Sequence, residues 1–148
     1  MKKFFFTLQT VHDYKLTVEK TQKAALANAE ALLRELYNAE KKLNDMFLQN
    51  SMSRDAELRN NTADAQSLAA YDAFFQHLSE EKRKLAVKII DAEAVKLRCQ
   101  ELLITTMKEL KAYGKLRDKQ YAEYLKEVAA EEEKALSDII SFSVATST

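Results

Sequence analysis

The chain has 148 residues, of which 31% are charged and 47% are hydrophobic, with one glycine and neither proline nor tryptophan. Its 23 basic residues balance its 23 acidic ones. The basic surface of a general nucleic-acid-binding protein is therefore not expected. The composition is typical of a long helix or coiled coil, and the regular spacing of its apolar residues argues against disorder.

The amino-terminal segment Met1–Phe6 does not predict a secretory signal. Its phenylalanines follow two lysines, but the apolar run breaks at Thr7 and no small-residue cleavage site follows. No stretch approaches the 18 or so apolar residues of a membrane span, so no direct membrane insertion is expected. The single cysteine, Cys99, can form neither an internal disulfide nor a zinc site, and its place on a helical seam favours a small core residue.

A first helix is predicted over about residues 8–50, because apolar residues recur there in steps of three and four. These recurring residues form a seam along one face of the helix, and the alanines among them would let a partner helix approach closely. A second set of side chains widens the stripe on one side, namely Leu26, Leu33, Tyr37 and Phe47. The seam itself consists of Leu8, Val11, Lys15, Val18, Gln22, Ala25, Ala29, Leu32, Leu36, Ala39, Leu43 and Met46.

The chain is predicted to reverse direction in a polar turn over about residues 51–63, where the heptad pattern is lost. Three side chains could cap the second helix there, because each can accept a hydrogen bond from a free backbone N–H. They are Asn61, Thr62 and Asp64, and the sequence does not choose among them.

A second helix is predicted over about residues 64–142, which would be on the order of 120 Å long. Gly114 and the ambiguous register over residues 116–121 indicate a stutter or bend. The tail, residues 143–148, is expected to fray. The seam consists of Leu78, Lys82, Leu85, Ile89, Ala92, Lys96, Cys99, Leu103, Thr106, Leu110 and Tyr113.

These elements predict an all-α fold, a single-domain antiparallel two-helix coiled-coil hairpin with unequal arms. A reversal near residue 58 would leave everything beyond about Arg117 without a partner in the first helix. That overhang carries an apolar stripe, and exposed apolar stripes mark interfaces. The residues predicted to bind a partner there are Tyr121, Tyr124, Val128, Ile139 and Phe142.

Phe74 and Phe75 mark a second candidate interface. Adjacent side chains lie about 100° apart around a helix, so a two-stranded seam buries only one of them well. Phe75 shares the seam with Leu78 and Leu85, which leaves Phe74 at its flank. A widened local core and a binding surface remain equally open explanations.

No catalytic arrangement is present in the sequence. His12 and His77 have no companion ligand at metal-binding spacing, and there is no glycine-rich phosphate loop. The acidic run Glu131–Glu133 is typical of a solvated helix face. We therefore expect a protein without catalytic residues, cofactor or metal, and not an enzyme.

Three stretches resemble the flagellar type III export protein FliJ family. Lys3–Val11 is similar to its F-x-F-x-L-Q-x-V opening, and Tyr71–Leu78 to its Y-x-x-F-hydrophobic-x-x-L block. Glu131–Ile139 is similar to its acidic carboxy-terminal segment. Phe5 departs from the pattern, which has a more polar residue between the first two aromatic positions.

The resemblance implies an antiparallel two-helix coiled coil similar to the central stalk of rotary ATPases. Proteins of this family are associated with the pore of the hexameric, FliI-like export ATPase and with the FlhA-like export gate, and they handle export chaperones. By this resemblance Tyr71, Phe74 and Leu78 would contact the gate, and the overhang would enter the ATPase ring. The implied location is cytoplasmic, peripheral to the inner face of the membrane at the flagellar base.

Two other functions fit the same periodicity. One is a structural coiled coil that self-associates through residues 121–142. The other is a helical chaperone that holds unfolded export substrates with Phe74 and the overhang. Periodicity alone does not decide between these and the stalk.

Overall fold

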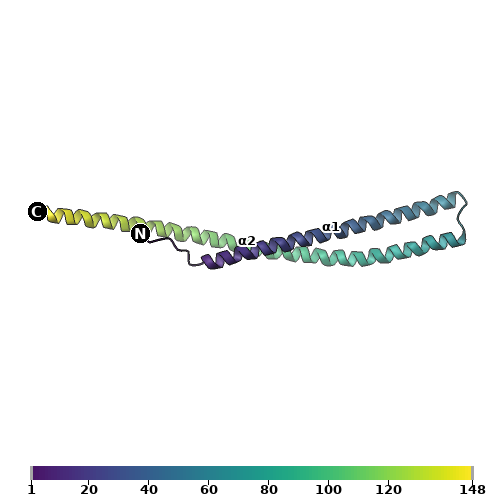
Figure 1. Cartoon of the computed structure of the whole chain (residues 1–148), viewed down its shortest axis with the longest axis horizontal. Helices are drawn as coiled ribbons and strands as arrows, with labels where there is room; N and C mark the ends of the chain where they lie inside the picture. Colours follow the sequence, from purple (N-terminus) through teal and green to yellow (C-terminus); the bar gives the residue numbers. More distant parts are fainter. Residues whose placement is uncertain (1, 148) are drawn as a thin grey trace. The chain divides into compact units, whose positions relative to one another are not determined.

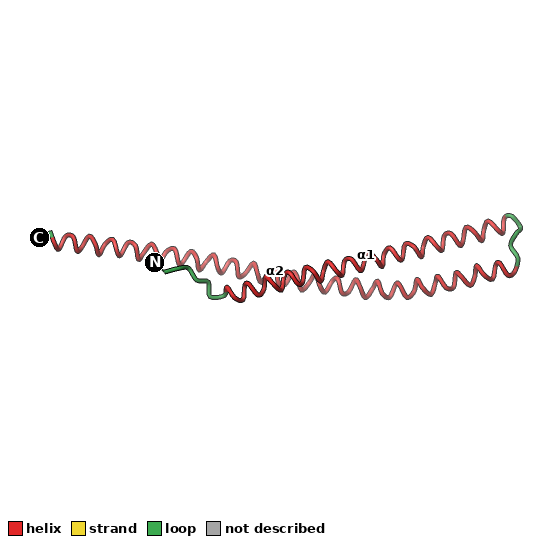
Figure 2. Tube along the Cα trace, viewed as in Figure 1, coloured by secondary structure: helices red, strands yellow, loops and turns green. Residues whose placement is uncertain are grey.

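In the computed structural model, which describes residues 2–147, the chain forms two helices, α1 (Gln9–Arg59) and α2 (Ala65–Thr146). Figure 1 shows α1 leading into a tight turn from which α2 returns, and Figure 2 shows that the loops are this turn and the segment before α1. The described residues contain no strand. The predicted all-α hairpin with unequal arms is confirmed, since α1 has 51 residues and α2 has 82.

The chain divides into two compact units, each containing part of both helices. The turn unit is Gln22–Leu102, and the terminal unit combines residues 2–21 with residues 103–147. The sequence predicted a single hairpin domain, whereas the contacts of the chain cluster in two groups.

The core of the turn unit lies along one face of each helix. On α2 the buried side chains are Leu78, Leu85, Ile89 and Ala92, as the seam predicts. Successive members of this set are seven, four and three residues apart, so all four point to the same side of the helix. Burial of this face, rather than helix propensity, is what stabilises such a long helix.

On α1 the buried face differs from the predicted seam by one residue. Leu33 is buried, with 4% of its surface exposed, whereas Leu32 is 50% exposed and Met46 is 46% exposed. Two heptad patterns overlap in this helix and share Ala29, Leu36 and Leu43. They differ in whether Leu32 or Leu33 lies on the buried face, and these two adjacent side chains point about 100° apart. The pattern that carries Leu33 packs on α2, and the pattern that carries Leu32 lies at the flank.

The turn begins nine residues later than predicted, because α1 continues through residues 51–59. Asn61 has a left-handed backbone, with φ of 54°. The N–H of Thr62 donates to the carbonyl of Glu57 at 3.0 Å, and the N–H of Asn61 donates to the carbonyl of Leu58 at 3.4 Å. These bonds form a Schellman motif that ends α1.

Asp64 is the residue that caps α2. Its carboxylate accepts a 2.6 Å hydrogen bond from the backbone N–H of Ser67, in the position expected of an N-cap. Among the three candidates, Asn61 instead ends α1 and Thr62 takes part in the same motif.

In the terminal unit the residues before α1 are residues 2–8, which we call the strap; residues 2–6 have no regular secondary structure and residues 7–8 form a turn. Phe6 is buried, with 3% of its surface exposed, whereas Phe5 is 77% exposed. Leu103 and Thr106 of α2 are also buried in this unit. The strap therefore packs one side against the helices and presents the other to solvent.

The carboxy-terminal part of α2 is more regular than predicted. The helix runs through Gly114 without interruption and extends to Thr146, where the predicted helix stops at residue 142. The hydroxyl of Thr146 donates to the carbonyl of Phe142 at 3.1 Å, one helical turn back. Of the tail predicted to fray, residues 143–146 are helical, and Thr148 lies outside the described residues.

Candidate partner-binding surfaces

Tyr71 is held in place by a carboxylate of α1. Its hydroxyl donates a 2.7 Å hydrogen bond to Glu57, which also accepts a 2.6 Å bond from the hydroxyl of Ser67. The bonds from Ser67 and Tyr71 lower the pKa of Glu57 below its ordinary value. The bond to Glu57 raises the pKa of Tyr71. Tyr71 is therefore fixed against the hairpin at its turn.

Phe74 and Phe75 separate as predicted. The ring of Phe75 packs against that of Phe47 at a centroid distance of 5.7 Å. Phe74 remains 41% exposed and stacks on His77 at 6.3 Å. Leu78 is only 2% exposed, so of the three residues assigned to the gate by resemblance it belongs to the core. The surface at this place is formed by Phe74 beside the braced Tyr71.

The strap covers part of the α2 face that was expected to be unpaired. The ring of Phe4 packs edge-on against Tyr121 at a centroid distance of 5.0 Å and is tilted against Tyr124 at 5.5 Å. The guanidinium of Arg117 lies 5.6 Å from the centre of the same ring. The hydroxyl of Tyr124 donates to the carbonyl of Lys2. The residues before α1, rather than α1 itself, therefore contact the part of α2 just beyond Arg117.

Beyond the strap, the described part of α2 is exposed to solvent. Every described residue from Ala129 to Ser147 is exposed, and Val128 is the last half-buried position. Four apolar side chains on one side of this segment are 54 to 71% exposed. We call them the C-terminal stripe; they are Leu136, Ile139, Ile140 and Phe142. The predicted binding residues thus divide into Tyr121 and Tyr124, which contact the strap, and Ile139 and Phe142, which do not and are exposed.

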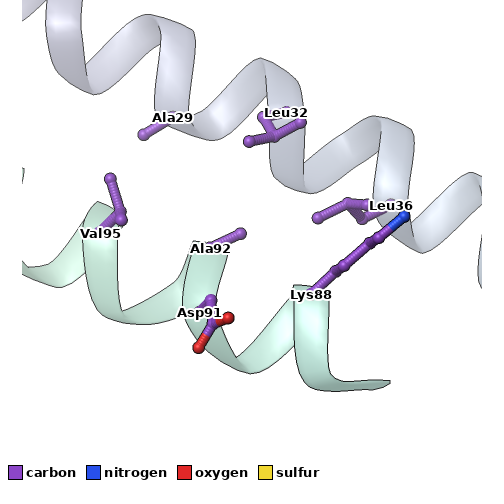
Figure 3. Close-up of a pocket in the computed structure, with 7 residues that line it drawn as sticks. All are labelled: Ala29, Leu32, Leu36, Lys88, Asp91, Ala92 and Val95. Atoms are coloured by element: carbon purple, nitrogen blue, oxygen red, sulfur yellow. The ribbon is translucent and has the colours of Figure 1, made fainter. Parts of the chain in front are cut away.

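A shallow depression lies on the flank of the turn unit (Figure 3). It has a volume of about 290 Å³ and forms where Ala29 of α1 and Ala92 of α2 leave space between the helices. Leu32 and Val95 form apolar walls, and the charged groups at its edge are Lys88 and Asp91. The alanine pattern of the sequence indicated close helix packing and did not predict this hollow.

A protein-family model matches nearly the whole chain. The family model described as "Flagellar FliJ protein" matches residues 4–147. The chain belongs to the FliJ family. No curated protein and no solved structure matches it. Since FliJ proteins are components of the flagellar export apparatus, this chain is one of them.

FliJ proteins are structural coiled coils rather than enzymes, and the surfaces described here are consistent with that class. Among residues 2–147, no three or more His, Cys, Asp or Glu side chains cluster as metal ligands would. No helix in this part of the chain is long and apolar enough to span a membrane. Cys99 is a half-buried free thiol.

Proposed function

We propose that this FliJ-family chain acts as a stalk-like binding protein that links the hexameric export ATPase to the export gate. In this proposal the C-terminal stripe, together with the end of the chain around the strap, enters the ATPase ring. Phe74 contacts the gate protein. The protein would work on the cytoplasmic side, peripheral to the membrane at the base of the flagellum, and would support export without catalysing a reaction.

The observation that carries the proposal is the uncovered carboxy-terminal part of α2. Single helices are marginal in water, and their stability in proteins comes from packing of an apolar face. Here Ile139 is 65% exposed and Phe142 is 71% exposed, with no described residue covering them. A partner that encloses this segment would remove their apolar surface from water at about 25 cal/mol per Å².

A second observation supports the gate contact. Phe74 lies exposed one turn after Tyr71, whose hydroxyl is fixed by Glu57. An aromatic side chain presented by a rigid helix loses little conformational entropy on binding, which is why such residues dominate interfaces. Leu78 would support this surface from the core rather than touch the gate.

The ring contact is tested by shortening α2 after Val128. This change removes the C-terminal stripe and leaves Tyr121 and Tyr124, which pack on the strap. We expect co-sedimentation with the hexameric export ATPase to be lost, while thermal unfolding of the remaining hairpin changes little.

A point substitution refines this test. Ile139→Lys places a charge on the stripe, and Ser141→Lys places the same charge about 160° around the helix, on the opposite face. Ile139→Lys should weaken ATPase binding by at least about tenfold, whereas Ser141→Lys should leave it within about twofold. Equal binding by the shortened chain and the full chain would remove the proposed role of the stripe.

A further inference from the structure

The outward face of α2 in the turn unit carries a second heptad pattern, which the intramolecular packing does not use. Val87, Ile90 and Leu97 are 57, 64 and 55% exposed, and Ala94 between them is exposed as well. Their spacing of three, four and three residues places all four on one side, roughly opposite the buried Leu85, Ile89 and Ala92. We call these four residues the outer stripe. A stripe with this spacing fits another helix.

We propose that the outer stripe is a self-complementary interface, through which two copies of this chain pair by antiparallel packing of their α2 helices. The proposal concerns different residues from those assigned to the ATPase and the gate, and it does not depend on either partner. It rests on how the small, large and charged side chains of the stripe match a second copy of themselves.

The packing argument concerns Ala94 and Leu97. A two-fold axis between residues 95 and 96 places Ala94 opposite Leu97 of the second copy, and the reverse pair follows by symmetry. A small residue facing a large one fills the space between two helices without a void. In the same register Ile90 lies against the aliphatic part of the Glu101 side chain of the second copy.

The charge argument concerns Asp91 and Arg98, which flank the stripe on one side. In the same antiparallel register Asp91 of each copy lies beside Arg98 of the other, which gives two opposite-charge pairs. Complementary charges at an interface set its register and suppress wrong alignments.

Other alignments of two copies are less favourable. Shifting the antiparallel register by one heptad makes Ile90 face Ala94 of the second copy. It then places the two Asp91 side chains against each other and Lys84 near Arg98 of the second copy. A parallel arrangement places the Glu101 side chains of the two copies against each other. It would also pair Arg98 with Glu93, whose carboxylate already accepts a hydrogen bond from Tyr37 of the same chain. Like charges directly opposed at an interface are destabilising.

The area of the stripe sets the expected affinity. Four side chains bury less than the roughly 1,200 Å² of a standard stable interface. We therefore expect a dissociation constant on the order of 10 to 100 μM, so that the chain is monomeric when dilute and paired when concentrated.

The experiment is sedimentation equilibrium of the full chain over a concentration range that spans these values. Leu97→Glu should lower the association constant by about tenfold or more. Val95→Glu is the matched control, because Val95 is also 55% exposed but lies off the stripe. It should change the constant by less than about twofold. Helix content should remain unchanged in both variants, since neither residue is buried.

A charge exchange tests the register itself. Asp91→Arg and Arg98→Asp should each weaken self-association by about tenfold, because each places like charges together in the homodimer. A mixture of the two variants, one carrying a fluorescent label, should restore pairing, because both charge pairs become opposite in the mixed dimer.

Three outcomes would overturn the proposal. One is a wild-type chain that stays monomeric through the whole range. The second is an association constant that Leu97→Glu leaves unchanged, which would place self-association elsewhere, such as the C-terminal stripe. The third is failure of the mixed variants to pair.

Discussion

The hydroxyl of Tyr71 on α2 donates a 2.7 Å hydrogen bond to the carboxylate of Glu57 on α1, fourteen residues earlier in the chain. This bond joins the two helices next to the turn, and Ser67 donates to the other carboxylate oxygen at 2.6 Å. Both donors favour the ionised form of Glu57, so its pKa is lower in the folded protein than the ordinary value of 4.5.

A pH dependence of stability follows for Glu57. Because its folded-state pKa is lowered, its contribution is present above about pH 4.5 and is lost as the pH falls through the folded-state value. Glu57→Gln should lower the melting temperature at pH 7 by about 1 to 3 °C and should have a smaller effect at pH 3. Asp55→Asn, at an exposed position two residues away, is the control. An equal effect of Glu57→Gln at both pH values would contradict this account.

Leu78 lies in the core and Phe74 lies at the surface, so their substitution by alanine should differ in its cost to stability. Leu78→Ala removes a side chain that is 2% exposed and should cost about 2 to 5 kcal/mol of unfolding free energy. Phe74→Ala changes a residue that is 41% exposed and should cost less than about 1 kcal/mol. Urea unfolding followed by circular dichroism measures both.

Phe74→Ala also tests the gate contact. Phe74→Ala should weaken binding to the export gate while the protein remains folded. If Phe74→Ala binds the gate as well as the wild type does, the gate surface lies elsewhere.

The strap is tested by comparing adjacent phenylalanines. Phe4→Ala removes ring contacts with Tyr121 and Tyr124 and should cost about 1 kcal/mol or more. Phe5→Ala changes a ring that is 77% exposed and should have little effect on stability. Limited proteolysis of the strap should be faster only in Phe4→Ala. Equal protease resistance of the two variants would mean that the aromatic contacts do not hold the strap.

Gly114 offers a stabilising substitution. A Cβ added there meets no atom within 4 Å, and the residue lies inside a continuous helix. Gly114→Ala should therefore raise the unfolding free energy by about 0.5 to 1 kcal/mol through reduced backbone freedom in the unfolded chain. A decrease measured by thermal unfolding would indicate that the helix requires flexibility at this position.

Much of the fold follows from periodicity, as the second seam shows. Leu85, Ile89 and Ala92 are buried where their spacing predicts, and the packing of Phe75 leaves Phe74 at the flank. These positions are determined by a single heptad pattern with no competing pattern on the same side of the helix.

Other features depend on tertiary contacts that no local pattern contains. Leu32 and Leu33 belong to two overlapping heptads, and only packing against α2 decides that Leu33 is buried. The sequence did not choose among three candidate caps for α2. In the structure the left-handed Asn61 ends α1, and Asp64 caps α2. Likewise, no pattern in the residues before α1 indicated that Phe4 would reach Tyr121.

The central claim is that this FliJ-family chain binds the export ATPase through the uncovered part of α2. The most direct measurement is the ATP hydrolysis rate of the hexameric export ATPase, with sedimentation of the same mixtures, for the full chain and for the chain shortened after Val128. We predict that the full chain co-sediments with the ring and stimulates hydrolysis, and that the shortened chain does neither. Absence of binding by the full chain, or equal binding and stimulation by the shortened one, would contradict the claim.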